Sequence, residues 1–202
     1  GDNRSIEECV EIAKSVADAT DLPLVIMGCK NIEKDAELFT KVSEALQGKN
    51  ILVFSAREEN YKSVGASAVM AYSQKVGAES AVDINLAKQL NVLMTQLGVA
   101  PTSIVMNAGS AAAGYGYEYV ASTQSDTQLQ MPILTPVSPE TWSVKESMVS
   151  EADMPEWGSA EERGIEMEIT TAAACLAGGS DAVIMRHPAA IKAISEMIEA
   201  LV

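Results

Sequence analysis

Histidine and clustered cysteine are what this 202-residue sequence most conspicuously lacks. Its single histidine is His187, and its three cysteines, Cys9, Cys29 and Cys175, stand far apart. No Cys-x-x-Cys pair is present, so the spacing indicates neither a disulfide framework nor an iron–sulfur or zinc site. One histidine excludes a His-rich metal site. The ordinary interpretation of the three cysteines is that each is a small buried side chain.

Positive charge and long apolar runs are also scarce. Lys and Arg number 14 against 28 Asp and Glu, so the formal net charge is −14, which disfavours binding to nucleic acid or to an anionic membrane. No apolar run approaches the roughly 20 residues that span a bilayer, and the polar start at residues 1–4 is unlike a signal peptide. We therefore expect a cytoplasmic protein, a single domain over residues 1–202, with no nucleic-acid or membrane partner.

A glycine- and tyrosine-rich stretch at residues 107–119 is the most unusual feature that is present. It follows the apolar run 103–106. Its glycines permit positive φ and close approach of another body, and its tyrosines offer amphipathic surface. Two interpretations are open: a contact loop for a ligand or partner, or a strand-to-helix turn with no ligand. The contact candidates in this stretch are Gly114, Tyr115, Gly116 and Glu118.

Short apolar runs alternate along the chain with segments of helical periodicity. The runs that read as strands are 22–27, 51–54, 78–84, 103–106, 131–137 and 181–185. The segments that read as helices are 5–17, 32–46, 60–72, 86–97, 164–177 and 188–201, with a further short helix before Thr123. Such alternation with short links predicts a parallel sheet covered by helices.

The choice of architecture lies between an open doubly wound sheet and a closed barrel. No Gly-x-Gly-x-x-Gly follows the first strand, which argues against a dinucleotide-binding fold. The pattern fits a (β/α)8 TIM barrel that lacks roughly its first quarter. Part of the helix after barrel strand six is also expected to be missing, because the helical stretch that ends at Thr123 is too short to cover a barrel strand.

Function in a parallel barrel is expected where strands end and helices begin. Several polar and aromatic residues at such positions also have interpretations that need no ligand. Asp83 could be a helix N-cap, the two tryptophans could anchor their own loop, and Arg186-His187 could be ordinary charge at a helix start. No catalytic constellation, phosphate loop or metal-ligand spacing is present. The candidates at strand ends are Asp83, Asn85, Asn107, Arg186 and His187, with Trp142 and Trp157 in the long loop 138–160.

A series of separated motifs resembles the small subunit of the corrinoid iron–sulfur protein, which corresponds to the delta subunit of the acetyl-CoA decarbonylase/synthase (CO dehydrogenase/acetyl-CoA synthase) complex. The resemblance runs from about Cys9 to Leu201. Family members tend to carry Asp-Pro where this chain has Asn107-Ala108. The motifs are Glu59–Lys62, Asp83–Asn91, Gly114–Tyr119, Leu129–Pro132, Trp142, Pro155–Gly158, Glu162–Gly164 and Arg186–Pro188.

The resemblance implies a (β/α)8 barrel that is non-catalytic by itself and binds no cofactor alone. It implies a large (gamma) subunit as partner, which carries a [4Fe–4S] cluster and a corrinoid shared at the interface. Further implied partners are the methyltetrahydrofolate methyltransferase and acetyl-CoA synthase of the Wood–Ljungdahl pathway. The chain would cap the corrinoid during methyl transfer, and a lone histidine and scattered cysteines agree with its not being the redox subunit.

Two other functions stay open at this stage. The chain could be a barrel methyltransferase that holds a pterin with Asp83, Asn85 and Asn107. It could instead process a sugar or aldehyde, although Lys30 and Lys75 fall in links rather than at the strand ends where Schiff-base chemistry would need a lysine.

Overall fold

The computed structural model of the chain describes residues 4–115 and 126–202. The chain divides into two compact units. Unit 1 comprises Gly1–Asn107 and Thr127–Met131, and unit 2 comprises Ala108–Asp126 and Pro132–Val202. The single domain expected over residues 1–202 stays a prediction.

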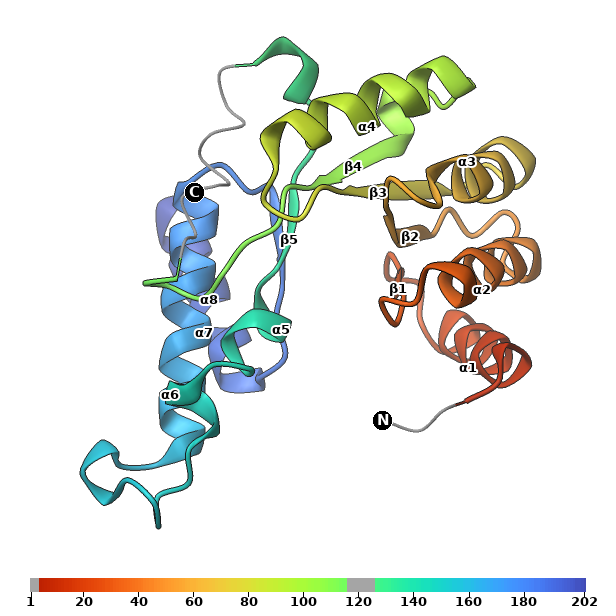
Figure 1. The fold of residues 1–202 in the computed structure, drawn as a ribbon. Helices are drawn as coiled ribbons and strands as arrows, with labels where there is room; N and C mark the ends of the chain where they lie inside the picture. Colours follow the sequence, from red (N-terminus) through yellow and green to blue (C-terminus); the bar gives the residue numbers. More distant parts are fainter. Residues whose placement is uncertain (1–3, 116–125) are drawn as a thin grey trace. The chain divides into compact units, whose positions relative to one another are not determined.

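Unit 1 is a four-stranded parallel sheet with helices between its strands (Figure 1). The strands lie in the order of the sequence, β1-β2-β3-β4. Its strands are β1 (Val25–Met27), β2 (Leu52–Ala56), β3 (Lys75–Glu79) and β4 (Ile104–Asn107). Its helices are α1 (Ile6–Ala19), α2 (Ile32–Ala45), α3 (Tyr61–Val64), a π-helical segment (Gly65–Ala71) and α4 (Ile84–Leu97), with short 3-10 turns at Pro101–Ser103 and Thr127–Leu129.

Local sequence signals place the helix ends of unit 1. Ser5 caps α1 through a capping box in which its hydroxyl accepts from the Glu8 N–H and the Glu8 carboxylate accepts from the Ser5 N–H, satisfying two amides that the helix leaves unpaired. Asn31 caps α2 by a single bond, in which its Oδ1 accepts from the Lys34 N–H at 3.0 Å. Gly98 ends α4 at φ +107°, a conformation that glycine adopts without strain.

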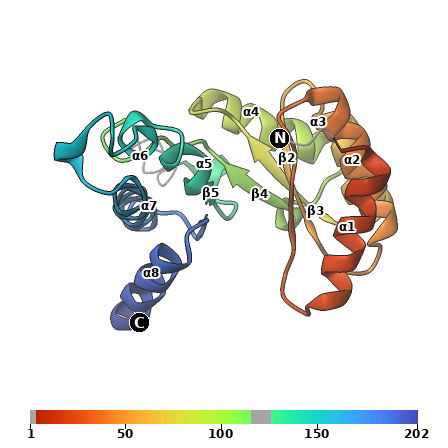
Figure 2. The same ribbon diagram turned by 90° about the horizontal axis from the view of Figure 1, so that it is seen from below.

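The core of unit 1 lies between the sheet and one layer of helices. Alternate strand residues, including Val53, Val76 and Ile104, pack with residues of the helices into a single cluster. Helices α1, α2 and α3 accordingly lie along the same side of the strands, and α1 and α2 pack side by side (Figures 1 and 2). All described helices of this unit that join the cluster therefore cover one face of the sheet.

Unit 2 is built around its longest helix. Its strands β5 (Leu134–Pro136) and β6 (Ala182–Ile184) pair in parallel. The helix α7 (Ala160–Ala177) packs against both α6 and α8, and α5 also contacts it (Figure 1). The remaining helices of this unit are α5 (Val137–Thr141), α6 (Lys145–Met148), α8 (Pro188–Leu201) and the 3-10 turn Pro155–Trp157.

The structure confirms six parallel strands alternating with helices and corrects three details. The third strand is Lys75–Glu79, not 78–84, because Ala81 and Val82 take positive φ in the turn that precedes α4. The expected loop 138–160 contains the short helices α5 and α6 and a 3-10 turn. The segment 60–72 is helical, but its second half is π-helix.

Other expectations stay predictions. The strands form a four-stranded and a two-stranded sheet, and a closed barrel is not shown. The short helix expected before Thr123 lies outside the described residues. Among the helices that are described, none combines the length and apolarity that crossing a membrane requires.

Candidate functional site

Three side chains converge at the carboxyl ends of β2 and β3 in unit 1. The Glu79 carboxylate accepts a hydrogen bond from Ser55 Oγ at 2.5 Å and pairs with Arg57 Nη2 at 2.5 Å. The Arg57 and Glu79 side chains are 29% and 19% exposed, so water screens this pair less than a surface ion pair. Asn60 Oδ1 accepts from the Arg57 N–H and holds the turn after β2.

Asn107 extends this group to β4. It stands opposite Glu79 in the parallel register, it is buried, and its carbonyl accepts from the Ser80 N–H. Because strand side chains alternate and Val76 and Ala78 pack toward the helices, Glu79 lies on the opposite face of the sheet. Ser55, Arg57, Glu79 and Asn107, hereafter the strand-end cluster, form a polar edge of unit 1.

Asp83 and Asn85 do not belong to that cluster. Both are exposed, and Asp83 Oδ1 accepts from the N–H groups of Asn85 and Leu86 at 2.8 and 3.1 Å. Asp83 is the N-cap of α4. The helix-cap interpretation of this aspartate is therefore confirmed, and the pterin-holding role would have to compete with the cap.

A second cluster forms around Trp142 in unit 2. The His187 ring stacks on the Trp142 ring with a centroid distance of 5.9 Å, and the Arg186 guanidinium lies 5.1 Å from the Trp142 ring centroid. Gly164 of α7 leaves room for the indole. The Trp142 Nε1–H is buried and has no acceptor among the described residues. We call Trp142, Arg186 and His187 the tryptophan cluster.

Both ring nitrogens of His187 are engaged. Nδ1 accepts from the Ala189 N–H at 3.2 Å, so His187 is the N-cap of α8. A nitrogen that accepts carries no proton, which places the proton on Nε2. Nε2 then donates to Glu161 Oε1 at 3.2 Å. The imidazole is fixed in orientation and tautomer by α7 and α8.

A buried carboxylate holds the backbone under this cluster. Glu168 is fully buried on α7, and its two oxygens accept from the N–H groups of Arg186 and His187 at 2.6 and 3.1 Å. Buried carboxylates are uncommon because losing hydration is costly unless strong hydrogen bonds replace it. Glu168 thereby attaches the loop that connects β6 to α8 to the side of α7.

Trp157 makes a different set of contacts. Lys145 Nζ lies 5.3 Å and Arg163 Cζ lies 5.7 Å from the centroid of its ring. The Arg163 guanidinium also donates to the backbone carbonyls of Glu146, Val149 and Gly158. Both tryptophans are partly buried and anchor the segment 138–160 to its own unit. Whether either also contacts a partner stays a prediction.

The glycine–tyrosine stretch is described only up to Tyr115. Gly114 is exposed at φ +88°. Tyr115 is 55% exposed, and its hydroxyl donates to the Glu146 carboxylate, which raises the pKa of Tyr115. The candidates Gly116 and Glu118 lie outside the described residues.

The three cysteines have different environments, which corrects the expectation that all are buried. Cys175 is buried, Cys9 is partly buried and Cys29 is exposed. Burial raises the pKa of the Cys175 thiol, while its hydrogen bond with Ser110 acts in the opposite direction. Cys29 follows β1, and both its N–H and its thiol donate to Asp35 Oδ1, at 2.7 and 3.2 Å.

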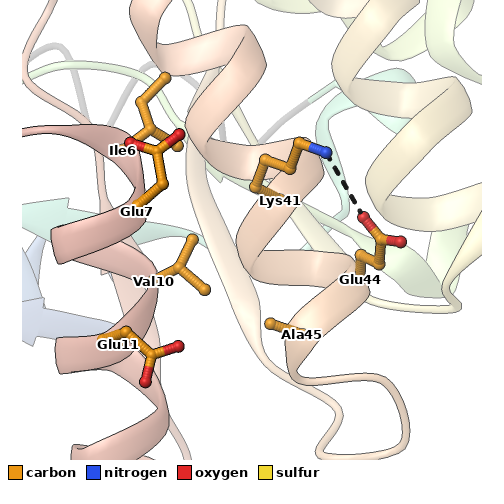
Figure 3. Close-up of a pocket in the computed structure, with 7 residues that line it drawn as sticks. All are labelled: Ile6, Glu7, Val10, Glu11, Lys41, Glu44 and Ala45. Atoms are coloured by element: carbon orange, nitrogen blue, oxygen red, sulfur yellow. Dashed lines mark ion pairs between the residues drawn. The ribbon is translucent and has the colours of Figure 1, made fainter.

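A groove of about 390 Å³ lies between α1 and α2 and shares no residue with either cluster (Figure 3). Its lining combines apolar and acidic side chains with Lys41, which pairs with Glu44. Among residues 4–115 and 126–202, no three His, Cys, Asp or Glu side chains are grouped as a metal site would require. The groove is lined by Ile6, Glu7, Val10, Glu11, Lys41, Glu44 and Ala45.

The structure thus brings Trp142, Arg186 and His187 together, and gives Asn107 a neighbour that sequence reasoning missed. Glu79 was missed because the third strand was placed three residues too late, which put this glutamate inside the strand instead of at its end. Glu168 was missed because one acidic residue in an amphipathic helix carries no signal. In the structure Glu168 lies on the buried side of α7, which it shares with Ala172 and Cys175.

Comparison with known proteins identifies the family. The family model described as the CO dehydrogenase/acetyl-CoA synthase delta subunit matches residues 2–197, which include residues of both clusters. The chain belongs to this family. Its resemblance to the delta subunit, noted from separated motifs, is therefore confirmed.

Individual relatives carry the same description. The acetyl-CoA decarbonylase/synthase complex subunit delta of Archaeoglobus fulgidus is 30% identical over 213 residues, covering 99% of this chain and 47% of that protein. The subunit of the same name from Methanopyrus kandleri is 30% identical over 203 residues, covering 96% of this chain and 50% of that protein. The chain spans about half the length of these delta-subunit relatives.

Proposed function

We propose that this delta-family chain is a non-catalytic part of the acetyl-CoA decarbonylase/synthase complex. In this role it is a scaffold that pairs with a larger subunit and covers a corrinoid held by that subunit. The corrinoid supplies methyl-carrier chemistry, between a methylated pterin and acetyl-CoA synthase. The contribution of this chain is to bind the partner and to exclude water from the shared site.

The observation that carries the proposal is the family match over residues 2–197. It spans both compact units, so it does not depend on one common motif. The relatives are described as subunits of a complex, which supports a role at an interface. The same description gives the methyltransferase alternative no support.

The contacts of His187 support a covering role over a metal-ligating one. It is the only histidine of the chain, and its Nδ1 and Nε2 are engaged by Ala189 and Glu161. An imidazole that ligated cobalt would have to give up one of these interactions and the α8 cap. The residues present therefore fit a wall beside a corrinoid better than a ligand to it.

We also propose that the strands belong to a (β/α)8 barrel. The sequential strand order and the single layer of helices in unit 1 support this, because a doubly wound sheet reverses its order and is covered on both faces. Ile26 packs toward the helices, whereas Val25 and Met27 on the other face are 40% and 43% exposed. In a barrel, side chains on that face of β1 would point into the interior, which is filled by side chains from the other strands.

The functional proposal is tested by expressing the full-length protein with and without a larger cysteine-rich subunit from the same source. Cobalt and iron are assayed in the complex and in this protein alone, and methyltetrahydrofolate binding is titrated. We expect a stable complex that contains both metals and no pterin binding by this protein alone. Micromolar pterin binding by the protein alone, with no complex formed, would instead establish the methyltransferase alternative.

The barrel proposal is tested by amide hydrogen exchange in the full-length protein. Leu24 O and Gly28 N bond to β2, so by alternation the N–H groups of Val25 and Met27 face the free edge of β1. If another strand joins that edge, these two amides will be protected to the same degree as the Ile26 amide. Rapid exchange confined to Val25 and Met27 would show an open edge and contradict a barrel.

A further inference from the structure

The Arg186 guanidinium stands out in unit 2 because it has no acceptor among residues 4–115 and 126–202. Its side chain is exposed and contacts the face of Trp142. Arg163, the other arginine of unit 2, instead directs its donors to three backbone carbonyls. Arg186 therefore keeps its guanidinium N–H donors available while the guanidinium carbon lies over the Trp142 ring.

Everything around Arg186 is held in place by internal contacts. Glu168 binds the N–H groups of Arg186 and His187, so the backbone beneath the side chain is fixed. His187 is clamped between Ala189 and Glu161 and stacks on Trp142. A guanidinium that already lies over a supported aromatic ring loses little side-chain entropy when it binds, which is how preorganisation improves affinity.

We infer that Arg186, supported by Trp142 and His187, binds a carboxylate of a partner protein through its in-plane N–H donors. This inference rests on the proposed function, in which the partner is the larger subunit of the complex. A planar guanidinium pairs with a carboxylate through two parallel hydrogen bonds. Arginine and tryptophan together are also the residues most enriched at energetically dominant positions of protein interfaces.

Two observations favour a carboxylate on a protein over a free phosphate. The chain carries a net charge of −14, and its field repels a small dianion more than a single carboxylate carried by a larger body. In addition, Ile191, one turn into the helix that His187 caps, is 43% exposed. That apolar surface offers a protein partner contact area which a phosphate ion would not use.

The test compares binding of the larger subunit to the full-length protein and to two variants, Arg186→Gln and Arg186→Lys, by calorimetry at low and moderate salt. We expect Arg186→Gln to weaken the Kd about tenfold or more and to lose most of its salt dependence. Arg186→Lys should fall between, because it keeps the charge but not the planar pair of donors. Lys192→Gln is the matched control: it removes one positive charge from exposed surface of α8, where Lys192 pairs only with Glu196, and it should bind as wild type.

The outcomes separate this inference from the proposed function. If the wild-type protein does not bind the larger subunit, the proposed function fails. If wild type binds and Arg186→Gln binds equally well, the Arg186 inference alone is overturned. A further experiment adds inorganic phosphate at constant ionic strength and follows tryptophan fluorescence. Phosphate could quench the fluorescence of the wild type but not of Arg186→Gln, while Arg186→Gln binds the larger subunit as well as the wild type does. That result would assign Arg186 to phosphate and would also overturn the inference. Unchanged thermal unfolding of each variant confirms that folding is intact.

Discussion

Gly164 of α7 lies directly against the six-membered ring of the Trp142 indole. A Cβ added at this glycine would stand 2.3 Å from Cζ3 and 2.5 Å from Cη2 of the ring, far inside van der Waals contact. The obstacle is a rigid ring that also carries His187 and Arg186 on its surface. The tryptophan cluster therefore requires a residue without a side chain at position 164 of α7.

Gly164→Ala should displace Trp142 and disturb the cluster. Overpacking costs typically about 1–3 kcal/mol, and the gain in helix propensity over glycine recovers at most about 1 kcal/mol. We expect net destabilisation, measured by denaturant unfolding, together with a change in the tryptophan emission of the folded protein. Thr170→Ala, at an exposed position of the same helix, is the control and should change neither. An unaltered emission spectrum in Gly164→Ala would contradict the packing.

Glu168→Ala should be more destabilising than most substitutions in this helix. It removes the acceptor of two backbone N–H groups, and leaving such groups unpaired costs about 1–3 kcal/mol each. We expect a loss of roughly 3 kcal/mol in the free energy of unfolding and faster amide exchange at Arg186 and His187. Glu166→Ala, exposed two residues earlier, should stay within about 0.5 kcal/mol of wild type. Equal effects of the two variants would show that Glu168 does not hold this link.

The strand-end cluster predicts energetic coupling between Arg57 and Glu79. Glu79→Gln and Arg57→Gln each break the 2.5 Å ion pair, and the double variant breaks it only once. The double variant should therefore lose less stability than the sum of the single ones, by about 1 kcal/mol for a partly buried pair. Denaturant unfolding of the wild type, the two single variants and the double variant measures this coupling free energy. The effects of Glu59→Gln and Arg57→Gln should add within error, since Glu59 is exposed and makes no hydrogen bond or ion pair with Arg57.

Cysteine reactivity should follow exposure and the raised pKa of Cys175. The reactive species is the thiolate, and burial disfavours it at Cys175. With iodoacetamide near pH 8, Cys29 should be alkylated first and Cys175 roughly tenfold or more slowly, as followed by mass spectrometry. In denaturant the difference should vanish. Comparable rates at the two thiols in folded protein would contradict the placement of Cys175.

The same group gives a pH dependence with a definite sign. The folded-state pKa of Cys175 lies above its unfolded value, so the protonated thiol favours the folded state. This contribution is fully present below about pH 8.5 and is lost as pH rises through the raised pKa. In a Cys175→Ser variant, the free energy of unfolding should therefore fall less than in the wild type as the pH rises through the raised pKa of Cys175.

Much of the local structure was predictable from sequence because its causes are local. Ser5 with Glu8, Asn31, Asp83 and Gly98 each act on backbone groups within a few residues, so their patterns place the ends of α1, α2 and α4. The short apolar runs likewise place five of the six strands. The third strand was misplaced because Val82 continues the apolar run but takes positive φ in a turn, which no periodicity reveals.

Family membership was also within reach of the sequence, since it depends on many separated motifs whose order needs no coordinates. What the tertiary structure alone decided is which side chains meet. Glu79 joins Arg57 across 22 residues, and Glu168 joins Arg186 across 18, through a strand register and a helix packing that depend on the whole unit. Residue types and spacing specify which groups could interact, but the distances on which hydrogen bonds and ion pairs depend exist only after the chain has packed.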